Sequence, residues 1–310
     1  MIPTIKWPGG KSFAFTIFDD TDLSTVANTQ AIYSFLYDLG LLTTKSVWPT
    51  RGRDIPRIGG ATCEDHDYLA WVESLQARGF EIGYHCATYH SSRRNETARG
   101  LDRFKGLFGQ YPSTMANHTG CQESIYWGSA RLQGANRLIY NLLTRYRHHQ
   151  RYLGHVQQSE FFWGDLCRER VRYVRNFVYA DINTLRNCPI MPYHDPERPF
   201  VNYWFASSEG PNCDAFNKCI SEKNQDRLES EGGACIMYTH LACGFQEQDG
   251  LNKRFRSLME RLSKMNGWFI PVERLLDYLL EAHNYHEITF LQRARIERRW
   301  LRDKMIVGPS

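Results

Sequence analysis

Short apolar runs and amphipathic stretches alternate along most of this chain, and their periods predict its secondary structure. Apolar runs predict strands at 13–18, 45–48, 80–85, 113–118, 176–182, 234–240 and 268–272. Helical spacing predicts a helix from Ser24 or Thr25 to Leu39, and further helices at 65–78, 95–108, 251–265 and 272–283. Because strands and helices alternate with little hairpin chemistry, the pattern favours an α/β protein with a parallel sheet or barrel.

Polar side chains gather where the predicted strands end. These positions are Asp19 and Asp20, His85, Asn117 and His118, Asp181, and His240. In parallel α/β folds the carboxyl ends of the strands meet at one face, and active sites lie there. The sequence therefore predicts a functional site at this face, with Asn117 and His118 as candidate substrate contacts.

Two segments, about 129–175 and 184–233, break the alternation and are interpreted as inserts. The first contains the basic and aromatic stretch TRYRHHQRY, and the second contains PYHDPERPFVNYWF. Both are hypothesised to be loops that shape a substrate cleft, and packing loops on a large barrel are the alternative. If the second segment lines a cleft, Tyr193, His194 and Trp204 are its candidate substrate-binding residues.

Composition narrows the class of protein. The chain has 310 residues and is 42% hydrophobic, which is enough for a large core, and its net charge of +4 does not indicate a nucleic-acid binder. Its nine cysteines include no Cys-x-x-Cys pair, which argues against a zinc ribbon and against a secreted disulfide framework. No apolar signal core is present at MIPTIKWPGG, so we expect a cytoplasmic protein.

A divalent metal is the simplest partner for the acid cluster that follows the first predicted strand. Asp19, Asp20 and Asp22 come together in FDDTD, and adjacent carboxylates repel one another unless a cation is shared. Histidines follow in EIGYHCATYH, where His85 and His90 are candidate ligands. Imidazole and carboxylate together suit zinc or a related transition metal such as manganese, cobalt or nickel.

At these residues the sequence resembles the NodB-type polysaccharide deacetylases (carbohydrate esterase family 4). FTIFDDTD is similar to that family's Thr-Phe-Asp-Asp motif, GFEIGYH to its Gly-His-Glu-Ile-Gly-Asn-His stretch, and IMYTHLACGF to its late Leu-x-His strand. NGWFIPVERLLDYL is similar to the closing strand and helix. The resemblance implies a distorted (β/α) barrel of the NodB-like type.

The resemblance also implies roles for individual residues. Asp19 would be the general base and His240 the general acid, while Asp20, His85 and His90 would bind the metal. Such a site hydrolyses an amide, because a metal polarises the carbonyl while a carboxylate and a histidine transfer protons.

The sequence departs from the family pattern at three points. His85 and His90 are five residues apart where the family has four, so His118 is the alternative third ligand. No arginine is present in 111–120, where the family has one that orients the base. After the acid pair the family has a glycine, whereas this chain has Thr21 and then Asp22. Asp22 could contact the metal, but capping of the next helix is the favoured interpretation.

The C-terminal segment 286–310 is predicted to be a basic amphipathic helix that follows a catalytic barrel at 1–285. Its apolar stripe contains Phe290, Ala294, Leu301 and Met305, and arginines cover most of the remaining surface. The stripe could pack on the barrel or on a second subunit, or the helix could contact a membrane or a lipid-linked substrate.

The predicted function is therefore metal-dependent removal of an N-acyl group from a sugar in an intracellular glycan precursor. Two alternatives stay open at this stage. The same metal site could hydrolyse a non-sugar amide or imide, or the barrel could be an inactive glycan-binding or assembly protein.

Overall fold

Seven parallel strands form a closed barrel in the computed structural model, which describes residues 5–53, 56 and 58–307. The strand order is β1 to β7 in sequence order, and β7 pairs with β1 to close the ring. The barrel strands are β1 (Phe13–Asp19), β2 (Thr44–Val47), β3 (Glu81–Tyr84), β4 (Thr114–Met115), β5 (Tyr173–Tyr179), β6 (Tyr203–Glu209) and β7 (Ala234–Thr239). The parallel barrel predicted from the sequence is confirmed.

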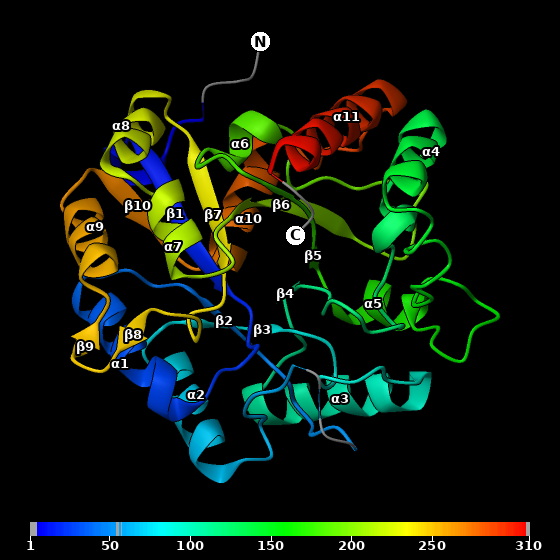
Figure 1. The fold of residues 1–310 in the computed structure, drawn as a ribbon, viewed down its shortest axis with the longest axis horizontal. Helices are drawn as coiled ribbons and strands as arrows, with labels where there is room; N and C mark the ends of the chain where they lie inside the picture. Colours follow the sequence, from blue (N-terminus) through cyan, green and yellow to red (C-terminus); the bar gives the residue numbers. More distant parts are fainter. Residues whose placement is uncertain (1–4, 54–55, 57, 308–310) are drawn as a thin grey trace.

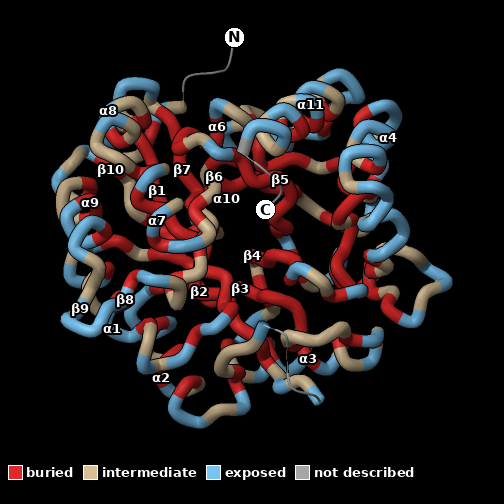
Figure 2. Tube along the Cα trace, in the orientation of Figure 1, coloured by how far each residue is buried: buried red, intermediate tan, exposed pale blue. Residues whose placement is uncertain are grey.

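Most of the helices surround the barrel on its outer side, while α10 (Val272–Ala282) lies across the amino ends of the strands (Figure 1). The helices are α1 (Val26–Asp38), α2 (His66–Ala77), α3 (Arg94–Phe108), α4 (Gly134–Leu143), α5 (Gly164–Arg170), α6 (Thr184–Asn187), α7 (Cys213–Cys219), α8 (Glu222–Ser230), α9 (Lys253–Ser263), α10 (Val272–Ala282) and α11 (Phe290–Val307). Figure 2 shows the strands buried and the outward sides of the helices exposed. This layering follows from the sequence pattern, because amphipathic helices cover strands that are apolar on both faces.

All seven residues of β1 are buried. It pairs with β7 along six residues, while its other edge is shared by β10 (Gly267–Phe269) at the start and β2 at the end. The strand ends at Asp19, so the acid cluster at residues 19–22 begins on a buried strand that is paired on both edges.

Local signals in the sequence fix the start and end of α1. Thr25 accepts a hydrogen bond from the Asn28 backbone, and the Asn28 side chain accepts one from the Thr25 backbone, which together form a capping box. The chain leaves the helix at Gly40, whose φ of 73° is a left-handed conformation that favours glycine. Because Thr25 caps α1, Asp22 does not cap this helix, and the capping role favoured from the sequence is wrong.

The segment 184–233 is not an insert, and this part of the predicted domain organisation is wrong. It contains α6, the barrel strand β6, α7 and α8. β6 was missed because its apolar residues follow directly on the proline-rich stretch 192–200, which obscures where the strand begins. β5 also begins three residues before its predicted start, and the difference brings Arg175 into the barrel.

The segment between β4 and β5 does lie outside the barrel, and it includes the 3-10 helix η2 (Gly128–Arg131), α4 and α5. α11 packs beside α4 and β5 and buries Ile296, Trp300 and Leu301. Phe290 and Met305, which the sequence placed in the packed stripe, are exposed instead. Within the described residues, no helix has the length and apolar character needed to cross a membrane.

Candidate functional site

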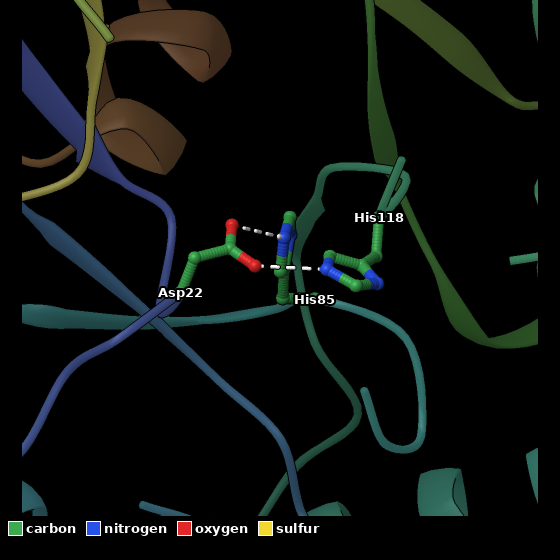
Figure 3. Close-up of side chains that lie close together, drawn as sticks. All are labelled: Asp22, His85 and His118. Carbon is green, nitrogen blue, oxygen red and sulfur yellow. Dashed lines mark ion pairs between the residues drawn. The ribbon is translucent and has the colours of Figure 1, made fainter. Parts of the chain in front are cut away.

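Asp22 lies at the centre of a cluster of histidines at the carboxyl end of the barrel. Its carboxylate is 2.8 Å from His118 Nε2, 3.0 Å from His240 Nε2 and 3.3 Å from His85 Nε2. The histidines follow β3, β4 and β7, and Asp22 follows β1, so four strands converge on one carboxylate. Figure 3 shows His85 and His118 both directed at Asp22.

The charges in this cluster depend on one another. Burial raises the pKa of Asp22, but the contacts with His118, His240 and His85 outweigh it and hold that pKa well below its usual range. For His240 burial also disfavours the charged form and so lowers the pKa. The hydrogen bond to Asp22 and the charges of Asp20 and Asp22 outweigh burial and raise the pKa of His240 to about 9. Asp22 is therefore ionised at neutral pH.

Asp22, His85 and His118 fit a divalent metal. One nitrogen or oxygen from each lies within 4.8 Å of the others, and Asp20, Asp22 and His240 form a second such group. Both ring nitrogens of the buried His85 make no hydrogen bond to the described residues, although buried imidazole nitrogens normally have a partner. A metal ion would give His85 Nε2 the bond that its 3.3 Å contact with Asp22 does not provide.

Asp20 is held by a two-pronged ion pair with Arg175. The two guanidinium nitrogens lie 2.8 Å and 2.5 Å from the two carboxylate oxygens, and both side chains are buried. Arg175 comes from β5 and lies 4.4 Å from the centroid of the Tyr238 ring. Its rigid fork fixes the orientation of the Asp20 carboxylate at the edge of the histidine cluster.

Asp19 has a different environment from its neighbour. Its carboxylate accepts hydrogen bonds from Tyr33 Oη (2.8 Å), Lys45 Nζ (2.9 Å) and the Leu241 backbone (2.8 Å). Successive side chains of a strand point to opposite sides, so Asp19 faces α1 whereas Asp20 faces Arg175. Asp19 is fully buried and does not line the cavity, and the geometry does not support its predicted place as the base.

A cavity of about 450 Å³ opens over the cluster. Its chemistry is mixed, with metal-competent groups, two arginines and aromatic rings. Its lining includes Asp20, Asp22, His85, His118, Trp127, Arg131, Arg175, Tyr238 and His240. Asn117 also lines it, but its side-chain amide is taken up by two hydrogen bonds with the Ile125 backbone.

His90 does not join the cluster, and the alternative ligand His118 takes its place. His90 lines a second cavity with Arg51, Arg93 and other residues. His90 is five residues beyond His85 and lies outside the cluster, whereas His118 follows the end of β4 and contacts Asp22.

The aromatic residues predicted to bind substrate lie elsewhere. Tyr193 and Trp204 are buried and pair with each other through two backbone hydrogen bonds at the amino end of β6. His194 Nδ1 donates to the Asn202 carbonyl at 2.9 Å. None of these three residues lines the cavity over the cluster, because that cavity lies at the carboxyl ends of the strands.

Sequence reasoning missed Arg175, Trp127 and Arg131. Arg175 carries a detectable signal, since it is the one charged residue in the strand YVRNFVY. A charge in a strand buried on both faces needs a partner, and here that partner is Asp20. Trp127 and Arg131 belong to the segment between β4 and β5 and carry no such signal.

Comparison with protein-family models gives no match, and neither does comparison with curated protein sequences. Solved structures do match the fold. A protein from Mycobacterium smegmatis, provisionally described as a polysaccharide deacetylase, is 12% identical with a TM-score of 0.53 over 93% of this chain and 96% of that one.

Two further structures are also similar. Puue allantoinase is 12% identical with a TM-score of 0.49 over 90% of this chain and 94% of that one. A protein from Pseudomonas aeruginosa PAO1, again provisionally described as a polysaccharide deacetylase, is 13% identical with a TM-score of 0.47 over 90% and 95%. At these identities the similarity to the Mycobacterium smegmatis structure shows a shared fold, and the NodB-like barrel expected from the motifs is confirmed.

Proposed function

We propose that this chain is a metal-dependent hydrolase that removes an N-acyl group from a sugar unit of a glycan precursor. The observation that carries the proposal is the contact of one carboxylate, Asp22, with three histidine nitrogens beside an arginine-clamped carboxylate, Asp20. This arrangement contains the parts that amide hydrolysis needs, namely a metal-competent group, a proton acceptor and a proton donor.

Asp22, His85 and His118 would hold the metal. When bound, the metal supplies polarisation of the acyl carbonyl and acidification of water. His118 Nδ1 lies 3.2 Å from Cys121 Sγ, which orients the ring so that Nε2 faces Asp22. This ligand set replaces the predicted Asp20, His85 and His90.

Asp20 takes the place of Asp19 as the proton acceptor in the proposal. Arg175 holds both of its oxygens, so the carboxylate keeps one orientation toward the cavity. His240 is the proposed proton donor to the leaving amine. Its Nδ1 donates to the Pro211 carbonyl at 2.7 Å, which leaves Nε2 directed at Asp22 and the cavity.

The size and lining of the cavity support a small substrate. A volume of about 450 Å³ suits a single sugar unit, and Trp127 and Tyr238 offer aromatic surface to its ring. A small non-sugar amide or imide also fits this volume, so the two substrate classes are separated by experiment.

The test is a product analysis with protein reconstituted with zinc, manganese, cobalt or nickel. We expect acetate and a primary amine to appear in equal amounts from one member of a panel of free, nucleotide-linked and lipid-linked N-acetyl sugars. A chelator is expected to abolish both products. Ring opening of a cyclic imide without acetate release would support the non-sugar alternative instead.

Absence of metal from the wild-type protein after incubation with all four ions would overturn the proposal. In that case the inactive glycan-binding alternative becomes the better account, and binding of the same sugar panel without turnover is its test.

A further inference from the structure

We propose that Arg131 forms an anion-binding subsite in the catalytic cavity, and that the substrate carries a carboxylate or phosphate beside the scissile amide. This inference rests on the proposed function for its link to a substrate. The subsite itself rests on the surroundings of one guanidinium group.

Arg131 is a buried arginine without a carboxylate. Four arginines are buried in the described part of the chain, and three of them have acidic partners: Arg175 pairs with Asp20, Arg198 with Asp195 and Glu297, and Arg293 with Asp195. Arg131 is 6% exposed and forms no ion pair with any described residue. Its Nε also has no hydrogen-bond partner there, which is costly for a buried charged group.

Two tryptophans hold the guanidinium in place. Its central carbon lies 3.5 Å from the Trp127 ring centroid and 4.9 Å from the Trp300 centroid. Glu297 of α11 accepts hydrogen bonds from the Gln133 backbone (3.2 Å) and Asn136 Nδ2 (2.9 Å), which fixes the chain just after Arg131 against α11. The charge is therefore preorganised, because aromatic faces orient a guanidinium and leave its hydrogen-bond donors available.

The other charges of the cavity are already matched. Asp20 is paired with Arg175, and Asp22 contacts three histidines. Burial lowers the pKa of Arg131 to about 10, so the group is charged at neutral pH. A positive charge without a counterpart in a substrate cavity is best satisfied by an anion that enters with the substrate.

The test uses metal-free protein and two small anions, inorganic phosphate and propionate, at constant ionic strength. Titration monitored by thermal unfolding is expected to show saturable stabilisation of the wild type by at least one anion. In Arg131→Gln the half-saturating concentration is expected to rise at least about tenfold, the change that follows from losing a charge-assisted hydrogen bond. Arg99→Gln, in the separate cavity that contains His90, is the matched control and should leave the titration unchanged.

The two titrations identify the class of anion. Stabilisation by phosphate alone indicates a phosphorylated substrate, and stabilisation by propionate alone indicates a substrate with a carboxylate. Equal half-saturating concentrations in wild type and Arg131→Gln, or no saturable effect in wild type, would overturn the subsite. If Arg131→Gln does not fold, Arg131→Met takes its place, because it removes the charge and keeps an apolar chain beside the two tryptophans, and an unchanged titration there has the same meaning. Because no metal or turnover is involved, a subsite that binds anions in a protein without hydrolase activity would refute the proposed function alone.

A second inference concerns α4, whose outward face is apolar. Leu138, Ile139, Leu142 and Leu143 are 55%, 44%, 61% and 56% exposed, and Tyr146 just beyond the helix is also exposed. Single exposed apolar residues are common, but a contiguous helical face of four marks an interaction surface.

The charge around α4 indicates the partner. No Asp or Glu occurs in residues 124–159, whereas the same stretch contains five arginines and three histidines. Arg145, Arg147 and Arg151 follow directly on the apolar face. We infer that this face docks on an anionic lipid surface, since an apolar helix face followed along the chain by basic residues is complementary to lipid headgroups and the acyl boundary beneath them.

Sedimentation with vesicles tests this second inference. We expect the wild type to bind vesicles of equal parts phosphatidylglycerol and phosphatidylcholine but not phosphatidylcholine alone. Leu138→Glu/Leu142→Glu is expected to reduce the bound fraction at least about fivefold. Tyr37→Glu, an exposed apolar position on α1 across the barrel, is the matched control.

Two results would contradict lipid docking. The first is equal binding of the wild type and the double variant to the anionic vesicles. The second is a wild-type dimer in solution that the double variant converts to a monomer without any vesicle binding, which would make α4 a subunit interface.

Discussion

Asp22→Ala is expected to remove the bound metal and amide hydrolysis together. Asp22 is the carboxylate that contacts His85, His118 and His240, so its loss removes a ligand and the group that orients the others. We expect the metal content to fall from about one ion per chain to near zero and the turnover number to fall on the order of 10³-fold or more. Elemental analysis and amine release measure the two effects.

Asp20→Asn is the matched comparison. Arg175 already satisfies the Asp20 carboxylate, so the variant is expected to retain metal while turnover falls by on the order of 10²–10⁴-fold. His118→Ala should lose metal like Asp22→Ala, and His90→Ala should retain it. Loss of metal in Asp20→Asn and His90→Ala, with retention in Asp22→Ala and His118→Ala, would restore the ligand set predicted from the sequence.

Lys45→Met is expected to destabilise the fold by about 3–5 kcal/mol, because it leaves the Asp19 carboxylate buried without its counter-charge. Both side chains of this ion pair are fully buried, with 2.9 Å between Nζ and the carboxylate oxygen. The free energy of unfolding in urea measures the effect. The double variant Asp19→Asn/Lys45→Met should recover much of the loss, because neither partner then carries a buried charge.

The contribution of this pair should persist across the neutral range. Burial lowers the pKa of Lys45, but the charge and hydrogen bond of Asp19 outweigh it and raise that pKa above its ordinary 10.5. A lysine whose pKa is raised on folding contributes stability below its unfolded pKa and loses it only as the pH rises through the folded value. The loss in Lys45→Met should therefore be the same at pH 6 and pH 8.

Arg254→Met is the control for this prediction. Arg254 pairs with Glu222 at 2.6 Å, but both side chains are about half exposed, so the pair should contribute less than about 1 kcal/mol. If Lys45→Met costs no more than Arg254→Met, Asp19 and Lys45 do not act as a buried structural pair. Asp19 would then be open again as a catalytic group.

The strands and helices nearest the chain termini were predicted well from the sequence, because their patterns are local. β1 is a mostly apolar run, and α1 starts after a capping residue and is followed by a glycine. β6 was missed since a proline-rich segment hides its start. Its stability also depends on parallel pairing with β5 and β7, which are distant segments of the chain that a local pattern does not report.

The site was predicted as a set of residue types at one face of the barrel, and several of its members were identified. His85, His118 and His240 come together as expected, because parallel strands bring their carboxyl ends to one rim. The positions of the acids were less well predicted. A motif reading of FDDTD cannot tell which carboxylate faces the helices and which faces the cavity, since a shift of one residue exchanges the two sides.

By itself, the periodicity of the sequence determined a parallel α/β fold with polar residues at one rim, and the resemblance of its motifs indicated the barrel and the histidine and carboxylate cluster. Only the tertiary structure showed that Asp19 pairs with Lys45, Asp20 with Arg175 and Asp22 with the histidines. Asp20 and Arg175 are 155 residues apart along the chain, so no local pattern links them. Which charge meets which partner was decided by burial, because a carboxylate inside the protein is stable only beside the group that the closed barrel brings to it.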